Sequence, residues 1–277
     1  MNLKDAIEFC FTYRPQWIGG KSQQTNRINC NHALRILGDV DCSTIKTKHF
    51  TQLQQTLLKE GKADGTANRV CAALHTILTE LSLNEEIDAV PSYRRLQEPE
   101  TKRSFFTREE AEMLVARAIE LPNDGQELQD SIRFALALGE RQGELVDLTW
   151  SDVDFEENTL TFPDTKNGTD HVLPIPATIL PMLERKYEER IDDKVFYWIN
   201  GGQLLRRFKR LKRLCGLPKD ERLWHSLRHT VATWMVNDGV PIKSIMAVLN
   251  HKNIETTLRY AKSTKEAKQS ALATIEI

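Results

Sequence analysis

The chain has 277 residues, of which 40% are hydrophobic and 28% charged, a composition that is ordinary for globular proteins and excludes a disordered tail or a collagen-like fibre. At roughly 150 residues per domain, this length allows about two domains. The start of the chain, MNLKDAIEFCFTYRPQ, carries charges where a signal peptide needs apolar residues, and no apolar run reaches the roughly 18 residues of a membrane span. We therefore expect a cytoplasmic protein.

The net charge of -1 hides an uneven distribution of charge along the chain. Lys plus Arg and Asp plus Glu number 12 and 12 in residues 1–100, 11 and 21 in residues 101–200, and 15 and 6 in residues 201–277. Basic side chains are densest at Arg206, Arg207, Lys209, Arg210, Lys212 and Arg213. This cluster suits a phosphate backbone, although a solvated helix face explains the cluster alone equally well.

The first hundred residues predict a small helical bundle. Apolar residues recur there at three- and four-residue spacing, and the expected helices are Leu3–Phe11, Thr25–Leu37, Thr47–Lys59 and Thr66–Leu81. The polar, proline-containing stretch EPETKRS then predicts a linker at residues 98–104. It separates a helical domain of residues 1–97 from a second domain of residues 105–277.

The second domain is expected to be mainly α-helical with a small antiparallel β-sheet, an α+β fold. The capping box TREE at residues 107–110 begins a helix that runs to about Leu121. Strands are expected at Val153–Phe155, Thr159–Phe162 and His171–Ile175, the last two joined by a tight Asn-Gly turn at residues 167–168. The other expected helices are Gln126–Leu138, Ala177–Arg190, Gln203–Leu214, His225–Asn237, Pro241–Leu249 and Ile254–Tyr260.

Nothing in the sequence predicts a cofactor or a metal ion. The fragment GGKS at residues 19–22 lacks the first glycine and the preceding strand of a phosphate-binding loop. The fragment HSLRH at residues 225–229 lacks the glutamate of a zinc protease and has an arginine between its histidines. The five cysteines form no C-x-x-C pair, so we expect reduced, mostly buried thiols.

A set of spaced residues carries the chemistry: Arg141 in GERQGELVDLTW, Lys166 in DTKNGTDHVLPIP, His225 and Arg228 in HSLRHT, and His251 and Tyr260 in LNHKNIETTLRY. In this order they resemble the tyrosine recombinase family, the phage-type integrases and their chromosomal relatives. The resemblance covers residues 105–277, and residues 1–97 fit the family's core-DNA-binding domain more loosely. It implies a site-specific recombinase, of a phage, a prophage or another mobile element, that cuts and rejoins double-stranded DNA through a 3′-phosphotyrosyl intermediate.

The expected roles follow from the charge of the transition state and from the resemblance. Attack on a phosphodiester adds negative charge, which fixed, planar cations such as Arg141 and Arg228 stabilise. By resemblance, Tyr260 is the nucleophile, and its phenol needs a proton acceptor. The resemblance also makes His225 a general base or acid toward Tyr260, His251 a hydrogen-bond donor to the phosphate and Lys166 the acid that protonates the leaving 5′ oxygen.

Other residues are expected to support this set. Asn250 replaces the family's usual glycine before the second histidine and should adopt a left-handed conformation. Ser226 replaces a common aspartate and leaves a capping hydroxyl. Glu144 resembles the family's acidic residue that orients rather than reacts, and we expect His229 to be structural.

DNA contacts are expected at helix starts in the first domain, at Lys46, Lys48, Thr66, Asn68 and Arg69, and in the second domain at Arg206, Arg207 and Arg210. The resemblance implies a homotetramer on two DNA segments, accessory DNA-bending or directionality proteins, and association with the nucleoid. The tail, residues 261–277, has apolar residues that suit docking onto a neighbouring subunit, and a frayed terminus explains it nearly as well. Two alternatives stay open at this point: DNA relaxation like that of a type IB topoisomerase, and a DNA-binding regulator that does not cut.

Overall fold

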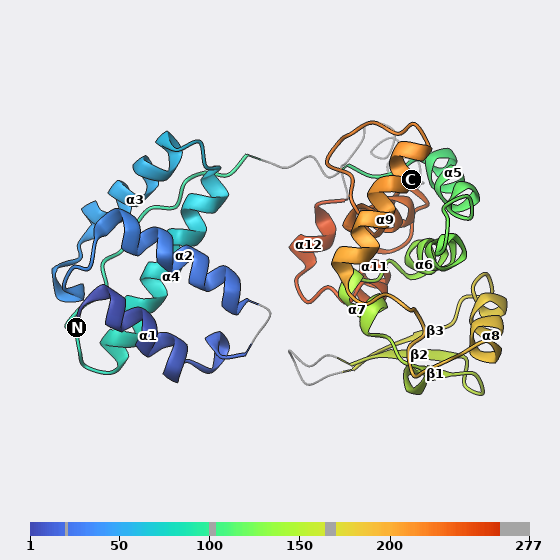
Figure 1. Ribbon diagram of the computed structural model, residues 1–277, viewed down its shortest axis with the longest axis horizontal. Coiled ribbons are helices and arrows are strands. Elements are labelled where there is room, and N and C mark those ends of the chain that lie inside the picture. The colour runs from blue at the N-terminus through green and yellow to red at the C-terminus, as the bar shows by residue number, and fades with distance from the viewer. Residues whose placement is uncertain (20–21, 100–103, 164–169, 261–277) are drawn as a thin grey trace, which may run out of the picture. The chain divides into compact units, whose positions relative to one another are not determined.

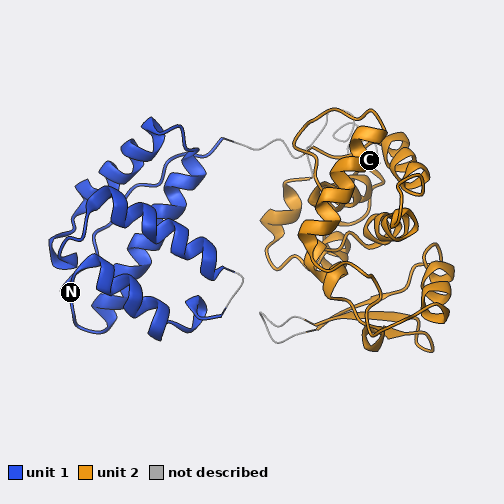
Figure 2. Ribbon diagram, viewed as in Figure 1, with its two compact units in different colours: residues 1–101 blue, residues 102–277 orange. Residues whose placement is uncertain are grey.

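The computed structural model describes residues 1–19, 22–99, 104–163 and 170–260. The chain divides into two compact units, residues 1–101 and 102–277 (Figure 2). The division falls inside the range expected for the linker, and the finer domain assignment stays a prediction. The Asn-Gly turn at 167–168 and the tail at 261–277 lie outside the described residues.

Unit 1 is a bundle in which α4 packs against the other helices (Figure 1). Its helices are α1 (Leu3–Tyr13), α2 (Gln23–Leu37), α3 (Thr47–Lys59) and α4 (Asp64–Leu83), with short 3-10 turns at Pro15–Trp17 and Cys42–Thr44. Apolar side chains at helical spacing on α4, including Leu74, Ile77 and Leu78, are fully buried against the other three helices. The bundle expected from the sequence is therefore present.

The chain that leaves α4 lies extended along α3 and α4 and is tied to both by side-chain hydrogen bonds. Gln54 donates to the carbonyl of Arg94 at 2.8 Å. Asn68 is 1% exposed; its amide donates to the carbonyl of Leu96 at 3.0 Å and its oxygen accepts the Leu96 N–H at 2.9 Å. The prediction that Asn68 contacts DNA is wrong, because this amide is buried and satisfies the backbone of residue 96.

Unit 2 is mainly helical with a small antiparallel sheet, as expected (Figure 1). The sheet has the order β1 (Val153–Asp154), β2 (Thr159–Phe162), β3 (His171–Pro174). Phe162, the last residue of β2, pairs with His171, the first residue of β3. The helices are α5 (Arg108–Ala118), α6 (Gly125–Leu138), α7 (Gln142–Asp147), α8 (Leu180–Glu188), α9 (Gly201–Leu214), α10 (His225–Asn237), α11 (Ile242–Val248) and α12 (Ile254–Leu258), and a 3-10 turn, Trp150–Asp152, precedes β1.

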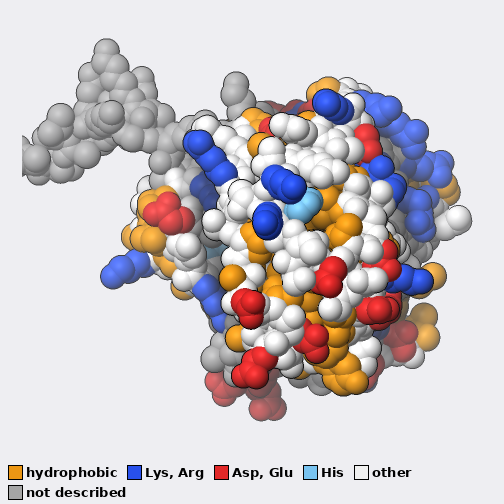
Figure 3. Space-filling model, turned by 90° about the vertical axis from the view of Figure 1, so that its left-hand side faces the viewer, with side chains coloured by type: hydrophobic (Ala, Val, Ile, Leu, Met, Phe, Trp, Pro, Cys, Tyr) orange, Lys and Arg blue, Asp and Glu red, His pale blue; other side chains and the backbone are white. Residues whose placement is uncertain are grey.

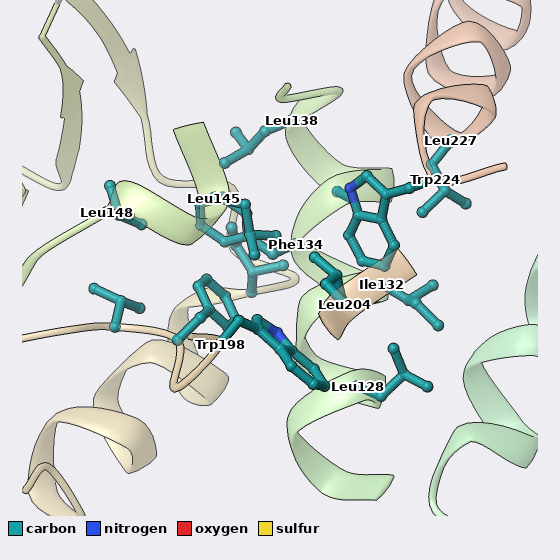
Figure 4. Close-up of a cluster of buried hydrophobic side chains, with 14 of the residues drawn as sticks. Leu128, Ile132, Phe134, Leu138, Leu145, Leu148, Trp198, Leu204, Trp224 and Leu227 are labelled. Carbon is teal, nitrogen blue, oxygen red and sulfur yellow. The ribbon is translucent and has the colours of Figure 1, made fainter. Parts of the chain in front are cut away.

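The core of unit 2 fixes the first residues of α7 and α10 (Figure 4). Leu145 of α7, Leu138 at the end of α6, and Trp224 and Leu227 at the start of α10 are buried in one cluster. Each such side chain contributes about 2 kcal/mol of hydrophobic stabilisation. The backbone of the neighbouring residues Arg141 and Arg228 is therefore held in place by the core.

The remaining expectations about the interior are met. The cysteines at 10, 30, 42, 71 and 215 are free and buried. Burial raises the pKa of Cys30 and of Cys71 to about 12, so both remain protonated thiols. In the part of the chain that the structure describes, no helix has the length and apolar character that crossing a membrane requires.

Candidate active site

Arg228 is clamped between the ends of two helices. Its guanidinium donates to the carbonyl of Gly139, just after α6, at 2.8 Å, and to the carbonyl of Leu249, just after α11. Carbonyls at helix C-terminal ends carry partial negative charge and attract cations. Arg228 is 3% exposed, so this buried cation has a fixed position.

Arg141 precedes α7 and is oriented by Glu144. The Glu144 carboxylate accepts the backbone N–H of Arg141 at 2.9 Å and its guanidinium at 2.6 Å. The same guanidinium donates to the carbonyl of Asn250 at 3.4 Å. Glu144 therefore holds the Arg141 side chain in place, and the two arginines reach carbonyls of consecutive residues. The Arg141 side chain remains 44% exposed and accessible to a ligand.

Two left-handed residues allow this close approach. Asn250 has φ +45°, which confirms the expected conformation at the position where the family has glycine. Gly139 has φ +69°, and a Cβ there would lie 2.7 Å from a side-chain carbon of Leu249. Glycine at residue 139 adopts this left-handed conformation without strain and leaves room for Leu249. The Ser226 hydroxyl accepts the backbone N–H of Leu223, three residues earlier in the chain, at 3.2 Å.

Tyr260 follows α12 and faces α10. Its ring packs with Ala232, Ile245 and Leu249 in a small apolar cluster and is 9% exposed. Its hydroxyl lies 2.6 Å from Nδ1 of His229. His229 was expected to be structural, but it contacts the oxygen proposed as the nucleophile. Its place one turn after His225 on a helix was the available signal, since residues at i and i+4 share a face.

The other two histidines flank Tyr260 and His229. His251 lies with its ring parallel to that of Tyr260 at 6.5 Å, and its Nδ1 is 2.9 Å from the hydroxyl of the fully buried Thr257. His225, exposed at the first residue of α10, packs edge-on against the ring of His229 at 4.7 Å. Thr257 was not singled out in the sequence, where nothing distinguishes it from its neighbours.

A pair of carboxyl groups lies beside the arginines. Burial, with a hydrogen bond to Glu144, raises the pKa of Glu140, which is 3% exposed. Burial also acts to raise the pKa of Glu144, but its hydrogen bonds with Glu140 and Arg141 lower it below its ordinary value. One proton shared between two close carboxyl groups explains these opposite shifts. Glu140 is not predicted from the sequence, where its only signal is a carboxyl directly after a buried helix end.

Electrostatic coupling joins these groups into one site. Burial lowers the pKa of Arg228, and the charge of Arg141 lowers it further, whereas Glu140, Glu144 and Tyr260 oppose the shift. A guanidinium remains protonated at neutral pH even in a buried site, so Arg228 stays cationic. The structure thus brings Arg141, Arg228 and Tyr260 together, with histidines around them.

Lys166 lies outside the described residues. Among residues that are described, no cluster of three His, Cys, Asp or Glu could hold a metal ion.

Residues 104–267 match the model of the phage integrase family. The chain belongs to this family. It is 28% identical over 282 residues to the tyrosine recombinase XerA of Thermococcus onnurineus, which covers 95% of this chain and 93% of that protein. It is 30% identical over 247 residues to the integrase of Haemophilus phage HP1, which covers 85% of this chain and 69% of that protein.

Solved structures of tyrosine recombinases share the fold of this recombinase. The Tn1549 transposon integrase in complex with circular intermediate DNA has a TM-score of 0.80 at 19% identity, covering 98% of this chain and 99% of that one. A lambda integrase tetramer bound to a Holliday junction has a TM-score of 0.78 at 20% identity, covering 96% of this chain and 80% of that one.

The basic residues of α9 divide into two groups. Arg206, Lys209, Arg210 and Arg213 are exposed at spacings that share a helix face. Arg207 instead pairs with Asp124 and donates to the carbonyl of Pro122 at 2.6 Å. These contacts within unit 2 neutralise the Arg207 charge and argue against the predicted DNA contact. Lys212 is also buried and pairs internally, with Asp220 at 2.6 Å.

The predicted contacts in unit 1 other than Asn68 lie on its surface. Lys46 and Lys48 at the start of α3, and Arg69 in α4, are exposed, and Thr66 is half-buried. Lys and Arg lie interspersed with Asp, Glu and hydrophobic side chains on the face drawn in Figure 3. Because the charge of this segment is balanced, the prediction that these residues contact DNA rests on their exposed positions in α3 and α4 and not on net charge.

Proposed function

We propose that this recombinase cuts and rejoins DNA at specific sites through a covalent bond between Tyr260 and a DNA 3′ phosphate, as the integrase of a phage, a prophage or another mobile element. One observation carries the proposal: the guanidinium groups of Arg141 and Arg228 bond consecutive carbonyls in a site that also holds the Tyr260 hydroxyl. Two fixed cations beside a phenol suit phosphoryl transfer.

The proposed step exchanges one phosphate ester for another. The Tyr260 oxygen attacks phosphorus, the P–O5′ bond breaks, and Lys166 protonates the departing 5′ oxygen. Arg141 and Arg228 neutralise the charge that grows on the non-bridging oxygens; each such donor is worth about 10²- to 10³-fold in rate. Because the phosphotyrosyl bond conserves the ester, a 5′ hydroxyl restores the strand without an external energy source.

His251 and His225 complete the proposed site. If the Thr257 hydroxyl donates to Nδ1 of His251, the ring carries its proton on Nε2 and can donate it to a phosphate oxygen. His225, exposed at the start of α10, supplies a general base or acid. Both roles follow the order of residues in the family and the contacts described above.

DNA binding and assembly complete the proposal. The exposed face of α9, with Arg206 and Arg210, and the surface residues Lys46, Lys48, Thr66 and Arg69 supply phosphate contacts. Strand exchange between two duplexes requires four nucleophiles, so we expect a homotetramer, and the similar lambda integrase forms a tetramer on a Holliday junction. We also expect accessory bending or directionality proteins, and action on nucleoid DNA in the cytoplasm.

A nicked suicide substrate tests the proposal, because its cleaved end diffuses away and traps the covalent complex. We expect a protein–DNA adduct that resists EDTA and is lost in Tyr260→Phe, which keeps the ring but removes the attacking oxygen. No adduct on a site that the protein binds tightly would favour the regulator. Relaxation of arbitrary plasmids by monomers would favour the topoisomerase.

A further inference from the structure

The hydrogen bond between His229 and Tyr260 has no role in the mechanism above. Nδ1 of His229 lies 2.6 Å from the Tyr260 oxygen, the atom that forms the new bond to phosphorus. We propose that His229 is the base that takes the proton of Tyr260 as the phenol attacks. The inference rests on the proposed function, because it assumes that Tyr260 is the nucleophile.

Independent contacts hold both partners of this hydrogen bond. His229 lies on α10, whose first turn is anchored in the core of unit 2 by Trp224 and Leu227. Tyr260 is fixed through its backbone N–H, which donates to Thr257 at 3.0 Å, and through its buried ring. The rings of His229 and Tyr260 are 5.7 Å apart and tilted by 45°. The contact therefore joins two positioned groups and is not a chance meeting of surface side chains.

The chemistry of the two groups suits this transfer. A neutral imidazole with its proton on Nε2 has a lone pair on Nδ1, to which the phenol hydroxyl donates. An unperturbed phenol loses its proton only near pH 10, whereas histidine titrates near pH 6.5, so about 3.5 pH units separate them in water. A base at hydrogen-bond distance lets the proton leave during attack, and free phenolate need not form first.

The proton and electron pairs balance over a full cycle. As the Tyr260 oxygen bonds to phosphorus, the O–H electron pair stays on oxygen and the proton passes to Nδ1 of His229, while the general acid protonates the 5′ oxygen. The resulting imidazolium lies close to the negative phosphoryl group, which stabilises it. In rejoining, the imidazolium returns the proton to the tyrosine oxygen as the P–O bond breaks.

The assignment changes the task of His225. Its ring lies 4.7 Å from that of His229, one turn nearer the start of α10, where it is exposed. With His229 at the phenol, His225 acts on the phosphate or on the leaving-group side. The two histidines at i and i+4 thus divide the proton transfers on one helix face.

The decisive experiment makes the phenol more acidic. Single-turnover cleavage of a suicide substrate is measured for the wild type, His229→Ala and His229→Asn, each with tyrosine or 3,5-difluorotyrosine at position 260, after thermal unfolding confirms folding. We expect His229→Ala to slow cleavage about 10²-fold. The fluorinated phenol should recover tenfold or more of this loss and change the wild type much less.

His229→Asn separates proton transfer from placement. Its amide oxygen can accept the phenol's hydrogen bond but cannot take the proton, so we expect cleavage as slow as in His229→Ala. Near-wild-type cleavage by His229→Asn, or no recovery with the fluorinated phenol, would overturn the proposal and leave His229 as a packing residue. His225→Ala, one turn away, is the matched control and should gain little from the fluorinated phenol.

A second substrate distinguishes the two ends of the reaction. A bridging 5′ phosphorothioate leaves without protonation, so it should rescue Lys166→Ala but not His229→Ala. Rescue of His229→Ala would contradict its role at the nucleophile. Adduct formation by Tyr260→Phe would instead refute the proposed function itself, independently of His229.

Discussion

The cations and the proposed nucleophile of this site rest on different parts of unit 2. Arg228 lies on α10, whose first turn is anchored in the main core by Trp224 and Leu227. Tyr260 belongs to a separate small cluster that includes Ile245 and Leu249 and lies among partly buried side chains. Local stability follows the number of buried apolar contacts, so the nucleophile's segment should open at lower free energy than the arginine's. We therefore expect the segment of Arg228 to stay closed more of the time than the segment of Tyr260, although both groups are held by contacts in the closed state.

The arginines help to join the two parts. Arg228 and Arg141 bond the carbonyls of Leu249 and Asn250, at the end of α11 and a few residues before Tyr260. A guanidinium has five N–H donors, so it can keep such a contact and still bind a phosphate. The cations proposed to stabilise the transition state therefore also hold the segment that carries the proposed nucleophile.

Arg228→Lys should break this connection and give the largest effect. A lysine has a single ammonium and cannot bridge the Gly139 and Leu249 carbonyls while also reaching a phosphate. We expect single-turnover cleavage to fall about 10²- to 10³-fold, with DNA affinity nearly unchanged. Arg133→Lys, exposed on α6, is the control and should cleave normally. Wild-type cleavage by Arg228→Lys would refute the clamp.

Truncating one fully buried leucine in each part compares their stabilities directly. Leu227→Ala should lower the global free energy of unfolding by about 2 to 5 kcal/mol, because it leaves a cavity in the main core. Leu249→Ala should cost less in global unfolding but accelerate amide hydrogen exchange in residues 254–260. Equal losses in denaturant titrations, with unchanged exchange in that segment, would show that the two clusters form one cooperative unit.

Glu140→Gln should flatten the pH dependence of stability. The pKa of Glu140 is raised in the folded state, so its contribution to folding is complete below the unfolded value, near 4.5, and is lost as the pH rises through the folded value. Glutamine does not titrate, so the variant should lose less stability between about pH 5 and pH 9, by about 2 kcal/mol. Glu112→Gln, exposed on α5, should reproduce the wild-type curve of unfolding free energy against pH.

Asn250 should give the smallest effect. Asn250→Ala replaces a residue that tolerates the left-handed region with one that is strained there, and should lower the free energy of unfolding by about 1 kcal/mol. Asn250→Gly removes that strain and should stay within about 0.5 kcal/mol of the wild type. A loss in Asn250→Gly as large as that in Asn250→Ala, measured by thermal unfolding, would show that the side chain matters more than the backbone.

Elements with local signals could be predicted from the sequence. The capping box at Thr107 forms as expected, because Thr107 and Glu110 bond each other's backbone N–H groups, at 3.2 and 3.0 Å. Strand β2 has the expected bounds. Helix α7, Gln142–Asp147, was missed because six residues are too few to show a helical period.

The errors concern side chains whose partners are distant in the chain. Asn68 bonds Leu96, 28 residues away; Arg207 pairs with Asp124, 83 residues away; and His229 contacts Tyr260, 31 residues away. Residue type and helix position predict exposed polar groups at Asn68 and Arg207 and a packing role for His229. Only the tertiary structure supplies the partner that changes the role.

The sequence by itself determined the family and predicted the reacting residues, because the order and spacing of Arg141, Lys166, His225, Arg228, His251 and Tyr260 are encoded along the chain. The tertiary structure decided which carbonyls hold the arginines, which carboxyl keeps its proton and which histidine meets the phenol. Those facts depend on angles and distances between helix ends that lie far apart in sequence. Packing sets such geometry, and periodicity carries no record of it.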